Sequence, residues 1–268
     1  MIAIEELGTI LSVWAHPDDE TYLAAGIMAA ARDNGQRVVC ANASAGELGT
    51  RNVIIRSATG ELVIEDTTSG TNGAVTWPPQ RLGQVRRWEA AAAMAVLGVT
   101  EHRVDDFPDG EFPMHDLSGR AWAADLLAEV QPDTVLTFGP EGMTFHLDHI
   151  AVHRWVTRAW HAAGRPGRLL YAVPSAEKLA RFMPLYEEWD MYMSPLRPVG
   201  VPRAEIPLNH TLTGTALDRK ITALRAMSTQ TGALTASVDE ALLHDLVAEE
   251  TFVVATEVRE SVAASDGC

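Results

Sequence analysis

The sequence predicts an α/β protein with a Rossmann-like, doubly wound, mostly parallel sheet, helices on both faces and a C-terminal elaboration. Short apolar runs of strand length alternate along the chain with longer segments of helical patterning. This alternation is typical of βαβ units, in which a helix connects two parallel strands. Polar and glycine-rich turns separate the segments, which supports the same reading.

The apolar runs predict five strands in the first two thirds of the chain. They are Gly8–Ala15, Val38–Ala43, His102–Phe107, Thr134–Phe138 and Arg168–Val173. Helical patterning predicts four intervening helices, at Thr21–Asn34, Arg81–Leu97, Arg120–Val130 and His149–Ala163. Gly35 follows the first helix as a left-handed cap, and Pro132 stops the third.

The pattern weakens beyond Pro174. Helices are predicted there at Ala176–Tyr186, Leu217–Met227 and Glu240–Glu249, and "FVVATEV" is predicted to be a late edge strand. No internal repeat or linker divides the chain. We therefore expect a single domain over residues 1–268, with a core at about 8–174, an insertion at about 51–73 and a C-terminal elaboration at 175–268.

The amino-acid composition indicates which kinds of binding partner are expected. The 268 residues are 47% hydrophobic and 21% charged, with a formal net charge of −15. This acidity argues against nucleic acid and anionic membranes, because phosphate contacts need clustered Lys and Arg. Cys40 and Cys268 make no disulfide framework, and no apolar run approaches membrane-spanning length. We expect a cytoplasmic enzyme with a small-molecule substrate, and the sequence leaves a homo-oligomer open.

Two loops carry residue types that bind metals. "HPDDE" follows the first predicted strand and brings His16, Asp18, Asp19 and Glu20, and "GPEGMTFHLDH" follows the fourth. The second loop and the start of its helix bring four more candidates, His146, Asp148, His149 and His153. In an open parallel sheet of order 3-2-1-4, loops at the carboxyl ends of these strands flank one crevice. Imidazole and carboxylate ligands without thiolate suit zinc or another divalent transition metal.

Several of these residues also have a simpler explanation. Asp18 and Asp19 are suited to capping the following helix and offsetting its dipole, and Asp148 to capping the helix that starts at His149. A lone His146 or His153 is more often a surface or core histidine than a ligand. The joint occurrence of these residues in two loops that are predicted to converge favours the metal site.

"AHPDDE" followed by "HLDH" resembles the LmbE-like (PIG-L) family of zinc-dependent N-acetylglucosamine deacetylases. "SAGELG", "VRRWEAAAAMAVLGV" and "DFPDGEF" support the resemblance, which runs from about Gly8 to Arg154. The resemblance implies that the metal ligands are His16, Asp19 and His149. It implies that Asp18 is the general base, that His146 stabilises the oxyanion or protonates the leaving amine, and that Asp148 orients His146. It also implies substrate contacts by Arg86 and Asp109.

Three departures from the family pattern stand out. Leu147 replaces a common proline, Met227 replaces a frequent histidine, and about twenty residues are inserted from about Arg51 to Gly73. Within this insertion "VIIRSATGELVIED" predicts a β-hairpin with Gly60 in its turn. A lid at the active-site rim and a plain surface or oligomer contact are equally compatible with it.

The expected function is a metal-dependent hydrolase with Zn2+ (or Fe2+ or another divalent ion) that deacetylates an N-acetylated amino sugar or glycoconjugate. An amidase for a non-sugar or thiol-conjugate amide is the alternative with the same site. A nucleotide-binding domain without catalysis would need a glycine-rich phosphate loop where "HPDDE" stands. A two-metal phosphoesterase would need a second site, for which Glu20 and His153 are candidates, and His153 is also an alternative direct ligand.

Overall fold

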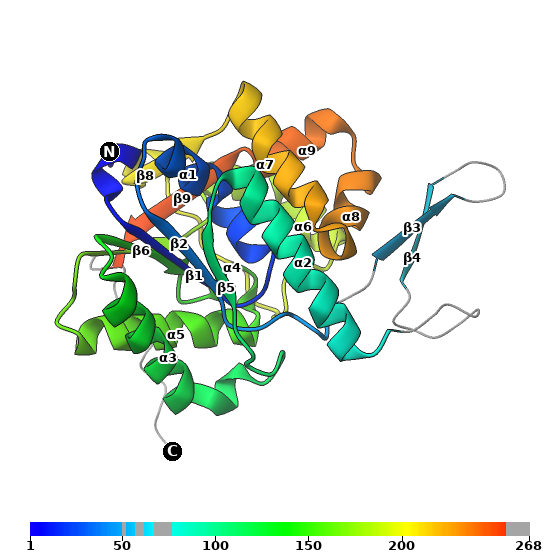
Figure 1. Ribbon diagram of the computed structural model, residues 1–268. Coiled ribbons are helices and arrows are strands. Elements are labelled where there is room, and N and C mark those ends of the chain that lie inside the picture. Colours follow the sequence, from blue (N-terminus) through cyan, green and yellow to red (C-terminus); the bar gives the residue numbers. More distant parts are fainter. Residues whose placement is uncertain (50–51, 57–61, 67–76, 256–268) are drawn as a thin grey trace, which may run out of the picture.

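The main sheet of the protein has seven strands in the order β5-β2-β1-β6-β7-β9-β8 (Figure 1). The computed structural model describes residues 1–49, 52–56, 62–66 and 77–255. Its main-sheet strands are β1 Ile10–Trp14, β2 Val38–Asn42, β5 Glu101–Val104, β6 Thr134–Phe138, β7 Arg168–Ala172, β8 Leu208–Thr211 and β9 Glu249–Val254. The five adjacent strands β5, β2, β1, β6 and β7 are parallel to one another. Strand β9 runs antiparallel to both of its neighbours, β7 and β8. The predicted doubly wound, mostly parallel sheet is confirmed.

Helices cover both faces of this sheet (Figure 1). One face carries α1 Asp19–Asp33, α2 Pro79–Leu97 and α7 Gly214–Ala226, which contact one another. The other face carries α3 Asp116–Val130 and α5 Leu147–Ala162, which pack together. The remaining helical segments are α4 Gly142–Phe145, α6 Ala176–Glu188, α8 Ser228–Ser237, α9 Glu240–Val247 and the 3-10 turns Ile4–Leu7, Phe112–His115 and Arg203–Glu205.

The centre of the sheet is buried on both faces. Every residue of β1, β2 and β6 is buried, as the apolar runs predict. Burying both faces of a parallel strand removes nearly all its side chains from water, which is the main favourable contribution to folding. The loops that carry the candidate site therefore follow strands whose residues are all buried.

The C-terminal region differs from the sequence prediction. "FVVATEV" was expected at an edge, but β9 lies between β7 and β8, and β8 is the edge strand. The β8 sequence, Leu208–Thr211, has only Leu208 fully buried, so it carries no apolar run that could reveal it. Helix α8 was also missed, because its small and hydroxyl residues lack an apolar period. Leu179, Phe182, Leu243 and Leu246 belong to a second hydrophobic cluster here, beside the main core.

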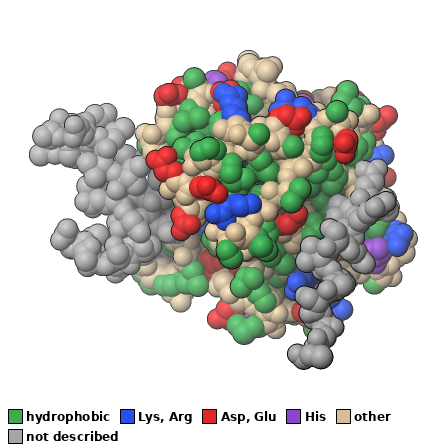
Figure 2. Space-filling model, turned by 180° about the vertical axis from the view of Figure 1, so that it is seen from behind, with side chains coloured by type: hydrophobic (Ala, Val, Ile, Leu, Met, Phe, Trp, Pro, Cys, Tyr) green, Lys and Arg blue, Asp and Glu red, His purple; other side chains and the backbone are tan. Residues whose placement is uncertain are grey.

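The insertion contains the expected antiparallel pair. Strand β3, Asn52–Arg56, pairs with β4, Leu62–Asp66, and β3 lies beside α8 (Figure 1). Gly60, predicted in the turn, lies outside the described residues. In the face of the molecule seen in Figure 2, acidic and basic side chains are interspersed among hydrophobic ones. None of the described helices has the length and apolarity that a bilayer crossing requires.

Candidate metal centre

The candidate site lies on the loops that follow two neighbouring parallel strands. β1 pairs directly with β6, so the loop after Trp14 and the loop after Phe138 leave the same edge of the sheet side by side. The rings of His16 and His149 lie 5.5 Å apart between centroids, although the two residues are far apart in sequence. The helices that follow, α1 and α5, point their positive N-terminal ends at this point.

Three residues form a compact set of metal-ligand atoms. One nitrogen or oxygen from each of His16, Asp19 and His149 lies within 4.8 Å of the others, and all three residues are buried. The Asp19 carboxylate lies between the rings, with Oδ1 3.3 Å from His149 Nε2 and Oδ2 3.7 Å from His16 Nδ1. Two imidazoles and one carboxylate are the donor set of catalytic zinc sites that keep a position open. The set therefore fits a divalent transition metal.

The His149 ring is fixed by stacking and by one hydrogen bond. It stacks on Phe138 on one side, at 4.2 Å between centroids and 11°, and on His146 on the other, at 4.7 Å and 21°. Its Nδ1 lies 2.9 Å from the carbonyl oxygen of Gly142, which only accepts, so Nδ1 carries the hydrogen. The Nε2 lone pair of the neutral ring is then directed at Asp19, where a metal would bind.

Gly142 is required at its position. Its φ is +61°, and a Cβ there would lie 2.6 Å from the His149 Cβ. Met143 and Phe145 beside it also have positive φ, of 63° each. Non-glycine residues in this region are strained, and such strain concentrates at functional sites. This loop is thus bent to bring its backbone against the His149 ring.

Two buried carboxylates hold the His16 ring. Its Nε2 lies 3.0 Å from Asp109 Oδ1 and 3.3 Å from Asp148 Oδ2. Burial acts to lower the pKa of His16, but the hydrogen bonds to Asp109 and Asp148 outweigh it and raise the pKa to about 10. Burial likewise acts to raise the pKa of Asp109, and its hydrogen bond with His16 brings it to about 2. With Nε2–H donated to the carboxylates, Nδ1 is the atom that faces Asp19.

The side chain and the backbone of Asp148 have different partners. Its carboxylate accepts hydrogen bonds from the backbone N–H groups of Gly110, at 2.7 Å, and Phe112, at 3.2 Å, besides contacting His16. Only its backbone N–H reaches His146, donating to Nδ1 at 3.1 Å, so His146 is the N-cap of α5. Asp148 therefore contacts His146 through its backbone N–H, while its side chain contacts His16.

Asp18 and His146 are the accessible members of the site. The Asp18 side chain is 21% exposed and His146 is half-buried, whereas the three candidate ligands are buried. Asp18 has φ 118° and makes no side-chain cap, so helix capping does not explain this residue. Burial, and the neighbouring Asp19 and Glu20, raise the pKa of Asp18 to about 8 although Arg86 opposes them. Burial lowers the pKa of His146.

Arg86 and Asp109, which the resemblance gave as substrate contacts, are built into the protein interior. Arg86 is 3% exposed and donates to the carbonyl oxygens of Gly46 and Pro17, at 2.6 Å each. It thereby ties the loop after β2 to the loop after β1, with Nη2 3.7 Å from Asp18 Oδ2. Asp109 is 8% exposed, and its second oxygen accepts from the Leu48 N–H at 2.8 Å. Both residues brace the loops, and their described contacts are with the protein itself.

The candidates for a second metal site have other partners. Glu20 is fully buried and accepts hydrogen bonds from Asn42 Nδ2 at 2.8 Å and Thr21 Oγ1 at 2.9 Å. His153 places Nδ1 2.9 Å from the Phe138 carbonyl oxygen and its ring against Tyr171. Within the described ranges, both clusters of metal-ligand residues include His16, and neither includes Glu20 or His153. The two-metal phosphoesterase therefore lacks support.

Asn42 is a site residue that sequence reasoning missed. Besides Glu20, its Nδ2 reaches the His16 carbonyl oxygen at 2.8 Å, so it fixes the loop that carries the candidate ligands. The signal was available in the sequence, since Asn42 is a polar residue at the carboxyl end of the apolar run of β2. Polar residues at that edge of a parallel sheet are expected to serve the crevice.

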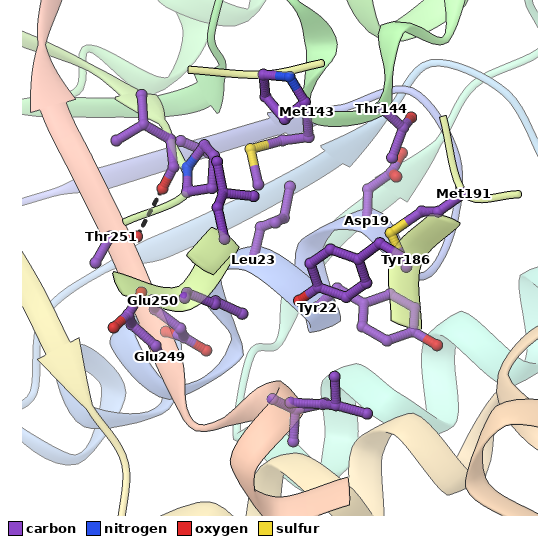
Figure 3. A pocket seen from close by; sticks show the side chains of 18 of the residues that line it. Asp19, Tyr22, Leu23, Met143, Thr144, Tyr186, Met191, Glu249, Glu250 and Thr251 are labelled. Carbon is purple, nitrogen blue, oxygen red and sulfur yellow. Dashed lines mark hydrogen bonds between the residues drawn. The ribbon is translucent and has the colours of Figure 1, made fainter. Parts of the chain in front are cut away.

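A large cavity opens beside the ligand set (Figure 3). Its volume is about 610 Å³, and Asp19, His149 and Phe138 form part of its wall. Most of its lining is aromatic or aliphatic, including Tyr22 and Leu23 of α1. Cavities of this size bury ligands far larger than a metal-bound water.

Comparison with known proteins agrees with the motif-based expectation. A family model described as "PIG-L: GlcNAc-PI de-N-acetylase" matches residues 11–160, which include both site loops. The chain belongs to the PIG-L family. A curated relative from Catenulispora acidiphila is named 1D-myo-inositol 2-acetamido-2-deoxy-alpha-D-glucopyranoside deacetylase 2 and is 31% identical over 177 residues. The match covers 60% of this chain and 53% of the relative, so this PIG-L chain spans about half the length of that protein.

Solved structures share the fold at low identity. N,N'-diacetylchitobiose deacetylase from Pyrococcus horikoshii matches with a TM-score of 0.61 and 17% identity, over 94% of this chain and 85% of that one. GalB, the 4-carboxy-2-hydroxymuconate hydratase from Pseudomonas putida, matches with a TM-score of 0.58 and 18% identity, over 92% and 96%. A deacetylase and a hydratase thus share this architecture, so the reaction has to be argued from the site residues.

Proposed function

We propose that this PIG-L chain is a zinc-dependent hydrolase that cleaves the amide bond of an N-acylated amino sugar or its conjugate. The observation that carries the proposal is the buried set of His16, Asp19 and His149 with accessible Asp18 and His146 directly beside it. The names of curated relatives, deacetylases of 2-acetamido-2-deoxy-glucopyranosides, support the substrate class.

His16, Asp19 and His149 would hold the ion. A zinc ion in such a site supplies Lewis acidity and lowers the pKa of a bound water to about 7. Asp18 would take a proton from the attacking water, since its carboxylate is 21% exposed and is held 3.7 Å from Arg86. Asp148 and Asp109 keep His16 in one tautomer by accepting from its Nε2.

His146 would serve the leaving group. Its Nδ1 accepts the Asp148 backbone N–H, so Nε2 is the atom free to hold a proton. A protonated ring there stabilises negative charge on the carbonyl oxygen and then gives its proton to the departing nitrogen. The oxygen of water is added to the carbonyl carbon and the C–N bond breaks, which yields a carboxylic acid and an amine.

The first experiment is metal content by mass spectrometry of the purified chain and of His16→Ala, His149→Ala and His161→Ala. We expect about one zinc per chain, lost in the first two variants. His161→Ala is the matched control, because His161 is an exposed histidine on the same helix, α5. A chain that binds no transition metal, and gains no activity when one is added, contradicts the proposal.

The roles of the two loop aspartates separate in a second experiment. Asp18→Asn should keep zinc and lose amide hydrolysis by about 10²–10⁴-fold, measured by release of primary amine from N-acetylglucosamine and its glycosides. Asp19→Ala should lose both zinc and activity. Equal zinc loss in the two variants would show that Asp18 is a ligand and that its assignment as base is wrong.

A further inference from the structure

The cavity beside the site is much larger than an acetyl group needs. It extends from Asp19 at one side to Glu249 and Glu250 at the other, with Leu23 and Met143 between them (Figure 3). Val173, Tyr186 and Trp189 add to the apolar wall. Its volume of about 610 Å³ lies in the range of pockets that bury drug-sized ligands. One methyl group would leave nearly all of this apolar surface in contact with water.

The two sides of the site differ in polarity. Asp18 and Asp109 lie on the loops after β1 and β5, beside Arg86 of α2, and none of these three polar residues lines the cavity. By contrast, α6, α9 and the ends of β7 and β9 surround the cavity with mainly apolar groups. Amide hydrolysis releases an amine that becomes an ammonium ion, and an apolar cavity disfavours that charge. The acyl side of the amide is the part that can be apolar throughout. The cavity therefore suits the acyl group.

The far end of the cavity carries a distinctive cation. Lys178 and Lys220 are the only lysines in the sequence, and all other basic side chains besides histidine are arginines. Lys220 is fully buried and pairs with Glu250 at 2.7 Å, and Arg203 pairs with Glu249. Lys178 lines the cavity and interacts electrostatically with Lys220, Glu249 and Glu250. Within the described part of the chain, its ammonium has no ion pair within 4 Å.

The neighbouring cations at this end are already paired. Lys220 pairs with Glu250, and the partly exposed Arg203 pairs with Glu249 and donates its backbone N–H to Glu177. Burial, reinforced by Lys220, lowers the pKa of Lys178 to about 8. A ligand atom that accepts a hydrogen bond would satisfy this ammonium, which lies near Glu249 and Glu250 at the end of a mainly apolar cavity.

We infer that this cavity is an acyl subsite: it binds an acyl group longer than acetyl, whose far end carries a hydrogen-bond acceptor, a carboxylate in the strongest case, received by Lys178. The inference rests on the proposed amide hydrolysis and names the class of acyl group. Each additional methylene buried in the cavity should tighten binding about fourfold, until the cavity is filled.

The first test is a series of N-acylglucosamines from acetyl to decanoyl. Octyl N-acetylglucosaminide is the matched control, because its alkyl group is attached to the sugar, on the amine side of the amide bond. We expect the dissociation constant from calorimetry, and KM of the zinc-loaded chain, to fall stepwise along the acyl series. The inference would be overturned if the dissociation constant and KM stay unchanged along the acyl series. It would also be overturned if only the octyl glycoside binds more tightly.

The second test uses Lys178→Met and chains that end in a carboxylate. We expect KM for an ω-carboxyacyl glucosamine to rise about 10–100-fold in Lys178→Met, with the unsubstituted acyl chain of equal length changing less than about twofold. An equal rise in KM for both substrates would show that Lys178 does not bind the terminal carboxylate. Because the buried Lys220 is the only other lysine, mass spectrometry after mild amine acylation reports Lys178 directly, and the carboxylated ligand should protect it.

Calorimetric binding keeps the two proposals separable. Long acyl chains that bind and protect Lys178 without hydrolysis of any amide would refute the proposed function and support the cavity assignment. Hydrolysis of acetyl substrates with no tighter binding of longer chains would support the function and refute the cavity assignment.

Discussion

The ion pair between Lys220 and Glu250 makes Lys220→Met a strongly destabilising substitution. Both side chains are 0% exposed and lie 2.7 Å apart. Lys220 also donates to the Tyr22 carbonyl oxygen at 2.7 Å, and Glu250 accepts from the N–H groups of Gly26 and Ile27 at 2.8 and 2.9 Å. The pair thus links α7 and β9 to one turn of α1, the helix that begins at the candidate ligand Asp19.

The magnitude follows from what the substitution leaves behind. Methionine matches the length of the lysine stem, so packing is kept while Glu250 becomes a buried carboxylate without its cation. Breaking a buried pair in this way costs about 3–5 kcal/mol of unfolding free energy. For a chain of this size that corresponds to a drop in Tm of about 6–20 °C.

Urea denaturation of the wild-type and variant chains measures this cost, provided that the slope with urea concentration is unchanged. The double variant Lys220→Met/Glu250→Gln removes the uncompensated charge, and should recover at least about 1 kcal/mol relative to Lys220→Met alone. A loss below about 1 kcal/mol in Lys220→Met, or a double variant that is as unstable as the sum of the two single changes, would refute the reasoning.

Further outcomes follow from other contacts. Lys178→Met should raise Tm at pH 7, because a folded-state pKa of about 8 against 10.5 makes unfolding free energy rise with pH between those values, and the gain should shrink by pH 10. Asp148→Asn should weaken zinc binding about 10–100-fold in chelator competition, with exposed Asp125→Asn unchanged. Gly119→Ala should cost about 1–2 kcal/mol in urea denaturation, because its Cβ would lie 2.1 Å from the buried Trp155 ring. Deleting residues 52–73 should change selectivity among acylated amines if the hairpin is a lid, and unchanged selectivity would remove that idea.

The sequence alone predicted the five parallel strands of the sheet and the two loops that carry the candidate site. Runs such as Thr134–Phe138 match the observed strand residue for residue, because a buried parallel strand needs a continuous apolar stretch. Alternation with helices indicates that these strands are parallel. In the doubly wound order that was assumed, the carboxyl-end rule then puts the loops with His16 and His149 at one edge. These features are local or topological, so sequence patterns can report them.

Tertiary structure decided which groups the candidate residues contact. Asp148 and Asp109 both reach His16, and Arg86 reaches the carbonyl oxygens of Gly46 and Pro17, across separations that no local pattern specifies. Strand β8 escaped prediction because an edge strand can be short and polar. The cavity and its lysine were hidden for a related reason. A concave surface is made by side chains from many elements, and its shape depends on how α6, α9 and β9 pack and on no single stretch of sequence.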